Sequence, residues 1–150
     1  QFLKRKTINL GIGDKVIFAG RIEQKKLPLY YSSADVLVMA SHYESFGLVG
    51  LEALACGRPV VSTPVGAMED LIKQSQAGRI VGDPLPRSLA EGIQSILTDA
   101  KLPPADEIRR SILEYSWSNV ASAIIREYET AMRQWPFENI RLLAAGASCG

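Results

Sequence analysis

The chain has 150 residues, of which 47% are hydrophobic and 22% charged, a composition typical of one globular domain with a sizeable core. It carries 17 Lys and Arg against 16 Asp and Glu, and this balance argues against a broadly electrostatic nucleic-acid binder. No apolar run approaches the roughly 18 residues of a membrane span. The 2 cysteines lie far apart in sequence and give neither a disulfide framework nor a CxxC metal pair.

The first part of the chain predicts two helices and two strands. Residues 1–10 form the end of a basic helix that stops at a Gly-Ile-Gly turn, which is a weak phosphate loop because a strand follows it. Residues 16–19 form a short apolar strand, and Pro28 begins a short helix that runs to residue 32. The apolar residues 36–39 do not alternate with polar ones, which is typical of a strand buried on both faces of a parallel sheet.

The rest of the chain continues this alternation of helices and strands. Two further strands are predicted over residues 60–61 and 79–81. Helices are predicted over residues 48–56, 67–74, 88–98, 105–115 and 119–133. Ser88 and Glu91 have the spacing of a capping box. We assign Trp117 and the stripe formed by Ile124 and Tyr128 to the core.

Short strands that alternate with helices indicate an α/β fold, a Rossmann-like parallel sheet flanked by helices. Ligands of such sheets bind beyond the carboxyl ends of the strands, here the loops after Ala19, Met39 and Thr63. We expect residues 1–135 to form one lobe and residues 136–150 to form a tail that is mobile or packs on a partner lobe.

A candidate anion site lies where the loop after residue 39 becomes a helix. The N–H groups of Phe46, Gly47 and Leu48 stand at the start of that helix, where backbone donors lack partners and the helix dipole is positive. Gly47 has no side chain to obstruct a close approach. This corner therefore suits a phosphate or a diphosphate.

Two acidic residues flank this corner. Glu44 lies in the loop, and Glu52 lies four residues beyond Leu48, which is about 6 Å further along a helix. A carboxylate one turn along could accept both hydroxyls of a ribose while the diphosphate occupies the helix end. Glu44 could then reach the group attached to the far phosphate.

This stretch resembles the family 4 retaining glycosyltransferases (glycosyl transferases group 1), specifically the carboxy-terminal half of a GT-B protein. The marker is Glu44, seven residues and Glu52, embedded in Glu-Ser-Phe-Gly-Leu-Val and followed by Glu-Ala-Leu-Ala-Cys-Gly-Arg-Pro-Val-Val. The resemblance covers about residues 14–130. The chain departs from the family at Ala40, where Pro is usual, and at Asp70, where Glu is usual.

The resemblance implies a role for each matching residue. Glu44 would hold hydroxyls of the donor hexose near the reacting centre, and Glu52 would hold the ribose. The amides of residues 46–48 would bind the donor diphosphate, with Ser45 beside them. The backbone of Ile22 would meet the nucleobase, and Leu27 would be an apolar neighbour of that pocket.

The resemblance also implies an activity, the transfer of a hexose from a nucleotide diphosphate sugar to an acceptor with retention at the anomeric carbon. The donor would be linked to UDP or GDP, and no resident metal or cofactor is expected. The family's phosphate-clamping Arg and Lys and its acceptor-binding lobe would precede Gln1. We therefore expect this stretch alone to be inactive. We also expect the protein to be cytoplasmic, because the first residues lack the apolar core of a signal peptide.

Simpler interpretations stay open at this point. Glu52 could be a solvated helix acid, Glu44 a mere loop acid and His42 an exposed loop residue rather than a proton-transfer group. The whole domain could bind a sugar nucleotide without catalysing anything, or belong to a sugar-nucleotide epimerase of the same GT-B architecture.

Overall fold

A computed structural model describes residues 1–134 of the chain. Its sheet has three parallel strands in the order β1-β2-β3. They are β1 (Leu37–Met39), β2 (Val60–Ser62) and β3 (Gly78–Ile80). The middle strand β2 is buried at every residue, because it has a strand on each side and helices on both faces. This burial agrees with the unbroken apolar pattern of its sequence.

Helices precede, connect and follow these strands. The α-helices are α1 (Phe2–Asn9), α2 (Leu27–Ser33), α3 (Leu48–Ala55), α4 (Met68–Ser75), α5 (Pro86–Leu97), α6 (Ala105–Ser111) and α7 (Trp117–Gln134). Short 3-10 turns occupy Gly13–Lys15, Gln24–Lys26 and Leu113–Tyr115.

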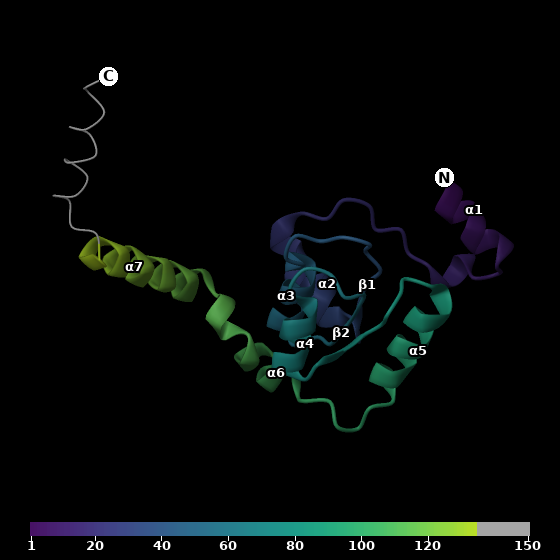
Figure 1. Cartoon of the computed structure of the whole chain (residues 1–150). Helices are drawn as coiled ribbons and strands as arrows, with labels where there is room; N and C mark the ends of the chain where they lie inside the picture. The colour runs from purple at the N-terminus through teal and green to yellow at the C-terminus, as the bar shows by residue number, and fades with distance from the viewer. Residues whose placement is uncertain (135–150) are drawn as a thin grey trace, which may run out of the picture.

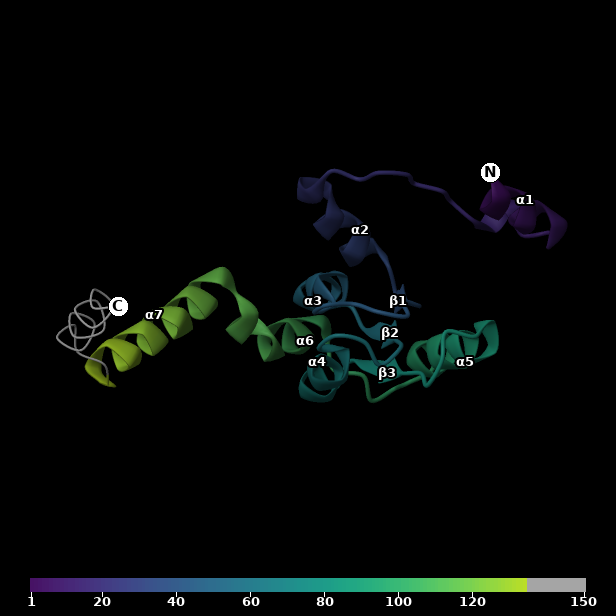
Figure 2. The ribbon, with the colours of Figure 1, turned by 45° about the horizontal axis from the view of Figure 1, so that its top comes forward.

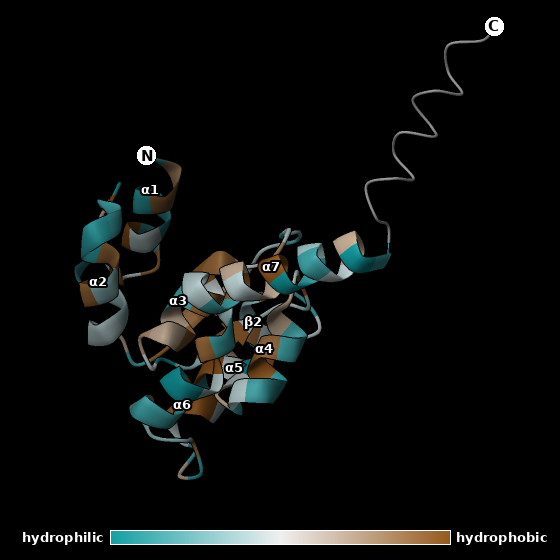
Figure 3. Ribbon diagram, turned by 90° about the vertical axis from the view of Figure 1, so that its left-hand side faces the viewer, coloured by the Kyte–Doolittle hydropathy of each residue, from teal (hydrophilic) through white to brown (hydrophobic). Residues whose placement is uncertain are grey.

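The helices form a layer on each face of the sheet. Helices α3 and α4 pack on one face and α5 on the other, as Figures 1 and 2 show. Val60 joins the main core with Leu54 and Leu71, whereas its neighbour Val61 faces Gly92 of α5. Figure 3 shows hydrophobic residues in brown gathered where β2, α4 and α5 meet. The predicted α/β fold with a parallel sheet flanked by helices is therefore confirmed.

The helix boundaries predicted from Pro and Gly agree with the structure. Helix α2 carries Pro28 in its first turn. Helix α1 ends at Asn9, before Gly11, and α3 ends at Ala55, before Gly57. These boundaries follow from local backbone chemistry, which does not depend on distant contacts.

The strand predicted over residues 16–19 is wrong. This segment is extended but pairs with no strand among residues 1–134, and Ile17 is 91% exposed. Phe18 instead lies under the ammonium group of Lys4, 5.7 Å from its ring centre. An apolar sequence becomes a strand only when a neighbouring backbone supplies hydrogen bonds, and none lies beside this segment.

The capping box predicted at Ser88 is also wrong. Helix α5 begins earlier, at Pro86, whose fixed φ suits the first helical position. Asp83 Oδ1 accepts a hydrogen bond from the N–H of Leu85 just before the helix. Glu91 pairs with Arg87 at 2.9 Å rather than with a cap residue.

The predicted burial of the last helix is wrong as well. Helix α7 extends from the body of the molecule (Figure 1), and its Trp117 is 90% exposed. Ile124 and Tyr128 are 47% and 67% exposed, because no other element covers this face among the described residues.

The predicted helix over residues 105–115 is α6 followed by a 3-10 turn. The predicted tail, residues 136–150, lies outside the described residues, so the division into lobe and tail stays a prediction.

Candidate functional site

The loop between β1 and α3 is tied to the adjacent end of β2. The Thr63 hydroxyl donates to the carbonyl oxygen of Ser41 at 2.6 Å, and the Thr63 N–H donates to that of Met39 at 3.2 Å. The Ser41 hydroxyl in turn donates to Glu44 Oε1 at 2.9 Å. The half-buried Glu44 carboxylate is therefore held at the carboxyl end of the sheet, where parallel sheets bind ligands.

A left-handed glycine makes the corner at which this loop enters α3. Gly47 has φ +91° and ψ +43°, a conformation that residues with a side chain rarely adopt. Its carbonyl oxygen accepts the N–H groups of Gly50 and Leu51, which begin the helical hydrogen-bond pattern. A Cβ at this position would also lie 3.0 Å from the sulfur of Met68. The corner therefore requires glycine for both its backbone conformation and its packing.

The loop after β2 holds the corner from the other side. The N–H of Ala67 donates to the carbonyl oxygen of Phe46 at 2.8 Å. Gly66 has φ +54°, and a Cβ there would overlap the same carbonyl group. The position of Phe46 is therefore set by close backbone contact between two neighbouring loops.

The amide groups at this corner have free hydrogen-bonding capacity. Among residues 1–134, the N–H groups of Phe46, Gly47 and Leu48 donate no hydrogen bond. Gly47 itself is buried, whereas Leu48, the first residue of the helix, is 62% exposed. Unpaired donors and the positive end of the α3 dipole favour an anion at this place.

Glu52 lies one turn further along α3 and is fixed by two side chains. The Tyr31 hydroxyl donates to Glu52 Oε2 at 2.8 Å, and the Gln24 amide donates to Glu52 Oε1 at 3.3 Å. Burial, together with the bond to Glu52 and its negative charge, raises the pKa of Tyr31 far above its usual value. Tyr31 is therefore a permanent donor at neutral pH. Because Glu52 accepts two hydrogen bonds, the simpler interpretation of it as a solvated, unpaired helix acid does not agree with the structure.

A cavity of about 250 Å³ brings two of the predicted site residues together. Leu27 and Glu52 both line it, from α2 and α3. Its lining consists of Gln24, Leu27, Pro28, Tyr31, Glu52, Ala55 and Cys56. Ile22 is half-buried in the preceding loop and Ser45 is exposed, and neither lines this cavity.

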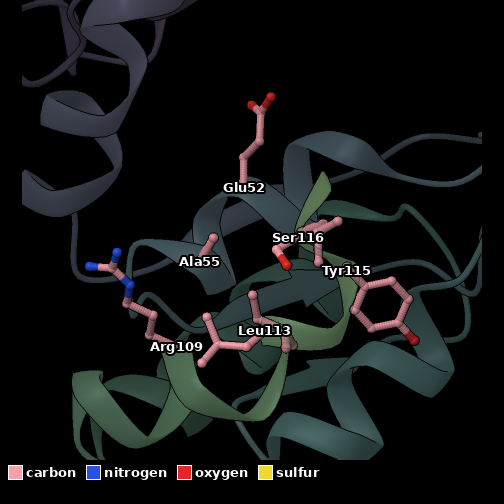
Figure 4. Close-up of a pocket in the computed structure, with 8 residues that line it drawn as sticks. Glu52, Ala55, Arg109, Leu113, Tyr115 and Ser116 are labelled. Atoms are coloured by element: carbon pink, nitrogen blue, oxygen red, sulfur yellow. The ribbon is translucent and has the colours of Figure 1, made fainter. Parts of the chain in front are cut away.

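A second cavity, of about 240 Å³, lies between α3 and the segment around α6. It is lined by Leu51, Glu52, Ala55, Arg109, Ile112, Leu113, Tyr115 and Ser116. Figure 4 shows the Glu52 side chain extending away from Ala55 and Leu113. Neither cavity is lined by Glu44 or by residues 46–48, so the two acids do not share one of these hollows.

Sequence reasoning missed Tyr31 and Gln24. They precede Glu52 by 21 and 28 residues, and they reach it only because the segment around α2 packs against α3. One signal was present: an acid in the largely apolar sequence of α3 needs a hydrogen-bond donor nearby. A tyrosine on the preceding helix is a natural candidate for that donor.

Two further properties of residues 1–134 bear on their function. No group of three or more His, Cys, Asp or Glu side chains converges to hold a metal ion. No helix in this range is both long enough and apolar enough to cross a bilayer.

The sequence profile of the glycosyl transferases group 1 matches residues 1–113. The chain belongs to this family. It is therefore a glycosyltransferase domain of the GT-B superfamily, as the resemblance of the region around Glu44 and Glu52 indicated. An uncharacterised glycosyltransferase of Methanocaldococcus jannaschii is 37% identical over 134 residues, which cover 87% of this chain and 34% of that protein.

Solved structures of similar proteins share the fold. Sucrose-phosphate synthase of Thermosynechococcus elongatus is 32% identical with a TM-score of 0.76, over 88% of this chain and 34% of that chain. The C-terminal domain of a glycosyl transferase group 1 family protein of Francisella tularensis is 29% identical with a TM-score of 0.65, over 76% of this chain and 60% of that chain. The chain thus spans about a third of the length of the curated relative and of the synthase.

Proposed function

We propose that this domain is the C-terminal, donor-binding lobe of a retaining glycosyltransferase that moves a hexose from a nucleotide diphosphate sugar to an acceptor. Its similarity to the C-terminal domain from Francisella tularensis supports the assignment to that lobe. The rest of such a protein would supply the acceptor site and the cationic side chains around the phosphates. A cytoplasmic location is part of the same proposal.

The observation that carries the proposal is the corner at Gly47, with free amide donors next to an oriented carboxylate. A donor diphosphate would accept hydrogen bonds from the N–H groups of residues 46–48, with Ser45 beside them. Glu52, about 6 Å further along α3 by the helical rise, would accept the ribose hydroxyls. Diphosphate and ribose are adjacent in a nucleotide sugar, so the spacing of these groups fits one ligand.

The two ends of the donor would extend in opposite directions from the diphosphate. The nucleobase would enter the region of Ile22 and of Leu27, which lines the same cavity as Glu52. The hexose would lie toward Glu44, whose carboxylate is already oriented by Ser41. UDP, GDP and ADP are all candidate carriers, because the contacts expected with the base involve backbone and apolar groups.

The chemical contribution of this lobe would be stabilisation of the leaving group. As the bond between the anomeric carbon and the phosphate oxygen breaks, negative charge develops on the departing diphosphate. Fixed amide donors and the α3 dipole act where that charge grows, which lowers the barrier. Glu44 would orient the hexose through its hydroxyls. The proposal assigns no resident metal or cofactor to this chain.

Calorimetric titration of the chain with UDP, GDP and ADP tests the proposal. We expect weak binding of at least one nucleotide and about a tenfold or greater loss of affinity in Glu52→Gln. Glu107→Gln, an exposed acid at the start of α6, is the matched control and should bind as the unaltered chain does. A folded chain that gives no heat with any of the three nucleotides would contradict the proposal.

A transfer assay separates the remaining enzymatic alternatives. The intact protein should form a glycosidic bond to an acceptor, whereas this chain by itself should bind nucleotide without turnover. Release of free epimerised sugar in the absence of acceptor would indicate the epimerase instead. Robust transfer by the 150-residue chain would overturn the assignment of acceptor binding to another lobe.

A further inference from the structure

The carboxylate of Glu52 is held at both oxygens by side chains from another part of the chain. Tyr31 donates to Oε2 at 2.8 Å and Gln24 donates to Oε1 at 3.3 Å. Tyr31 lies on α2 and Gln24 in the 3-10 turn immediately before it, so the carboxylate is bound by one continuous segment. A glutamate side chain has several rotatable bonds, and these two bonds select one of its many rotamers.

The two donors leave acceptor capacity on Glu52. An ionised carboxylate has about four lone-pair sites, and Tyr31 and Gln24 together use two of them. Each oxygen therefore keeps a site for one further donor. A vicinal diol, such as the 2′ and 3′ hydroxyls of a ribose, presents two donors at a spacing that suits two carboxylate oxygens.

We propose that Tyr31 is a positioning residue that fixes the Glu52 carboxylate for the two hydroxyls of a nucleotide ribose. Gln24 supports the same orientation through a longer and more exposed hydrogen bond. This inference rests on the proposed function, since it assumes that Glu52 binds the ribose. It adds a residue that touches neither the sugar nor the phosphates and acts only through Glu52.

The bond from Tyr31 is suited to this role. Tyr31 is half-buried and lines the same cavity as Glu52, so part of its hydrogen bond is shielded from water. The Tyr31 hydroxyl keeps its proton throughout the neutral range, because burial and the negative charge of Glu52 both oppose its ionisation. A hydrogen bond to a charged acceptor in such surroundings is stronger than one between neutral groups.

The test compares Tyr31→Phe with the unaltered chain against two ligands. The ligands are UDP and 2′,3′-dideoxy-UDP, or the corresponding GDP or ADP pair when UDP gives no heat. We expect Tyr31→Phe to bind the ribose ligand about tenfold more weakly and the dideoxy ligand unchanged. Tyr30→Phe is the control on the same helix, because Tyr30 is half-exposed and its hydroxyl makes no hydrogen bond among residues 1–134.

Comparison with Glu52→Gln separates the possible failures. If Glu52→Gln weakens ribose binding but Tyr31→Phe does not, the positioning role is overturned and the proposed function stands. A gain of affinity in Tyr31→Phe would show that the tyrosine competes with the ribose, which also overturns it. An equal loss for both ligands would indicate a merely structural role. If the unaltered chain binds none of these nucleotides, both proposals fail together.

Discussion

The central strand β2 and the segment at residues 16–19 have similarly apolar sequences but very different surroundings. Val60 in β2 is completely buried, whereas Ile17, in an equally apolar run near the N-terminus, is 91% exposed. Trp117, at the start of α7, is 90% exposed. The difference shows that an apolar run predicts what a segment could bury, while neighbouring elements decide whether it does so. The folding free energy of the described chain should therefore reside in the sheet and the helices that cover it.

The largest expected contrast is between a central and a peripheral substitution. Leu54→Ala removes a fully buried side chain from α3 and should lower the free energy of unfolding by about 3 kcal/mol. Ile17→Ala should change it by less than about 0.5 kcal/mol. Urea denaturation measures both. Equal losses in the two variants would mean that the N-terminal segment is packed in solution, which would break the comparison.

A substitution in the loop after β2 tests whether the close packing of the central region also fixes the shape of the candidate site. Gly66→Ala would force a side chain into a left-handed conformation and against the carbonyl group of Phe46. We expect a loss of about 2 kcal/mol in stability, with weaker nucleotide binding because the corner at Gly47 is displaced. Gly82→Ala is the matched control, since a Cβ there meets no atom within 4 Å. If both variants behave alike, the contact between the two loops does not fix the corner.

A smaller effect is expected on α7. Trp117→Ala should change the free energy of unfolding of this chain by less than about 0.5 kcal/mol, because the side chain is almost wholly exposed. Thermal unfolding of the two proteins at the same concentration checks this. A clear destabilisation would show that the helix packs on the body of the molecule.

The smallest expected effect is on the pH dependence of stability, through Asp99 just after the end of α5. The backbone N–H of Lys101 and the side chain of Arg79 donate to Asp99 and lower the pKa of its carboxyl below the usual value. The resulting stabilisation is present at neutral pH and is lost as the pH falls below about 4, where the carboxylate becomes protonated. Asp99→Asn should therefore differ from the unaltered chain at pH 7 and converge with it in acid. A stability difference that does not vary with pH would contradict this.

Features set by local backbone chemistry could be predicted from the sequence. Pro28 marks the first turn of α2, and Gly11 and Gly57 lie just past the ends of α1 and α3. The start of α3 at Leu48 was predicted as well, together with the amide corner that precedes it. These features depend on φ preferences and on the free N–H groups of a helix end, which are properties of a few consecutive residues.

Features that need a distant neighbour could not be predicted in this way. Residues 16–19 have the composition of a strand but no partner backbone beside them, and composition does not reveal the partner. The bond from Tyr31 to Glu52 depends on how the segment around α2 packs against α3. A single sequence indicates that Glu52 needs a donor, but not which side chain supplies it.

Two hydrogen bonds between the loops that follow β1 and β2 have a consequence for affinity. The hydrogen bonds from Thr63 to Ser41 and from Ala67 to Phe46 give the corner its shape through the chain's own atoms. An anion bound there, as proposed, would meet a preorganised set of donors and would not have to order a flexible loop, so little conformational entropy would be lost on association. A site of this kind discriminates by geometric fit, and it should favour ligands whose own shape is rigid at the same point.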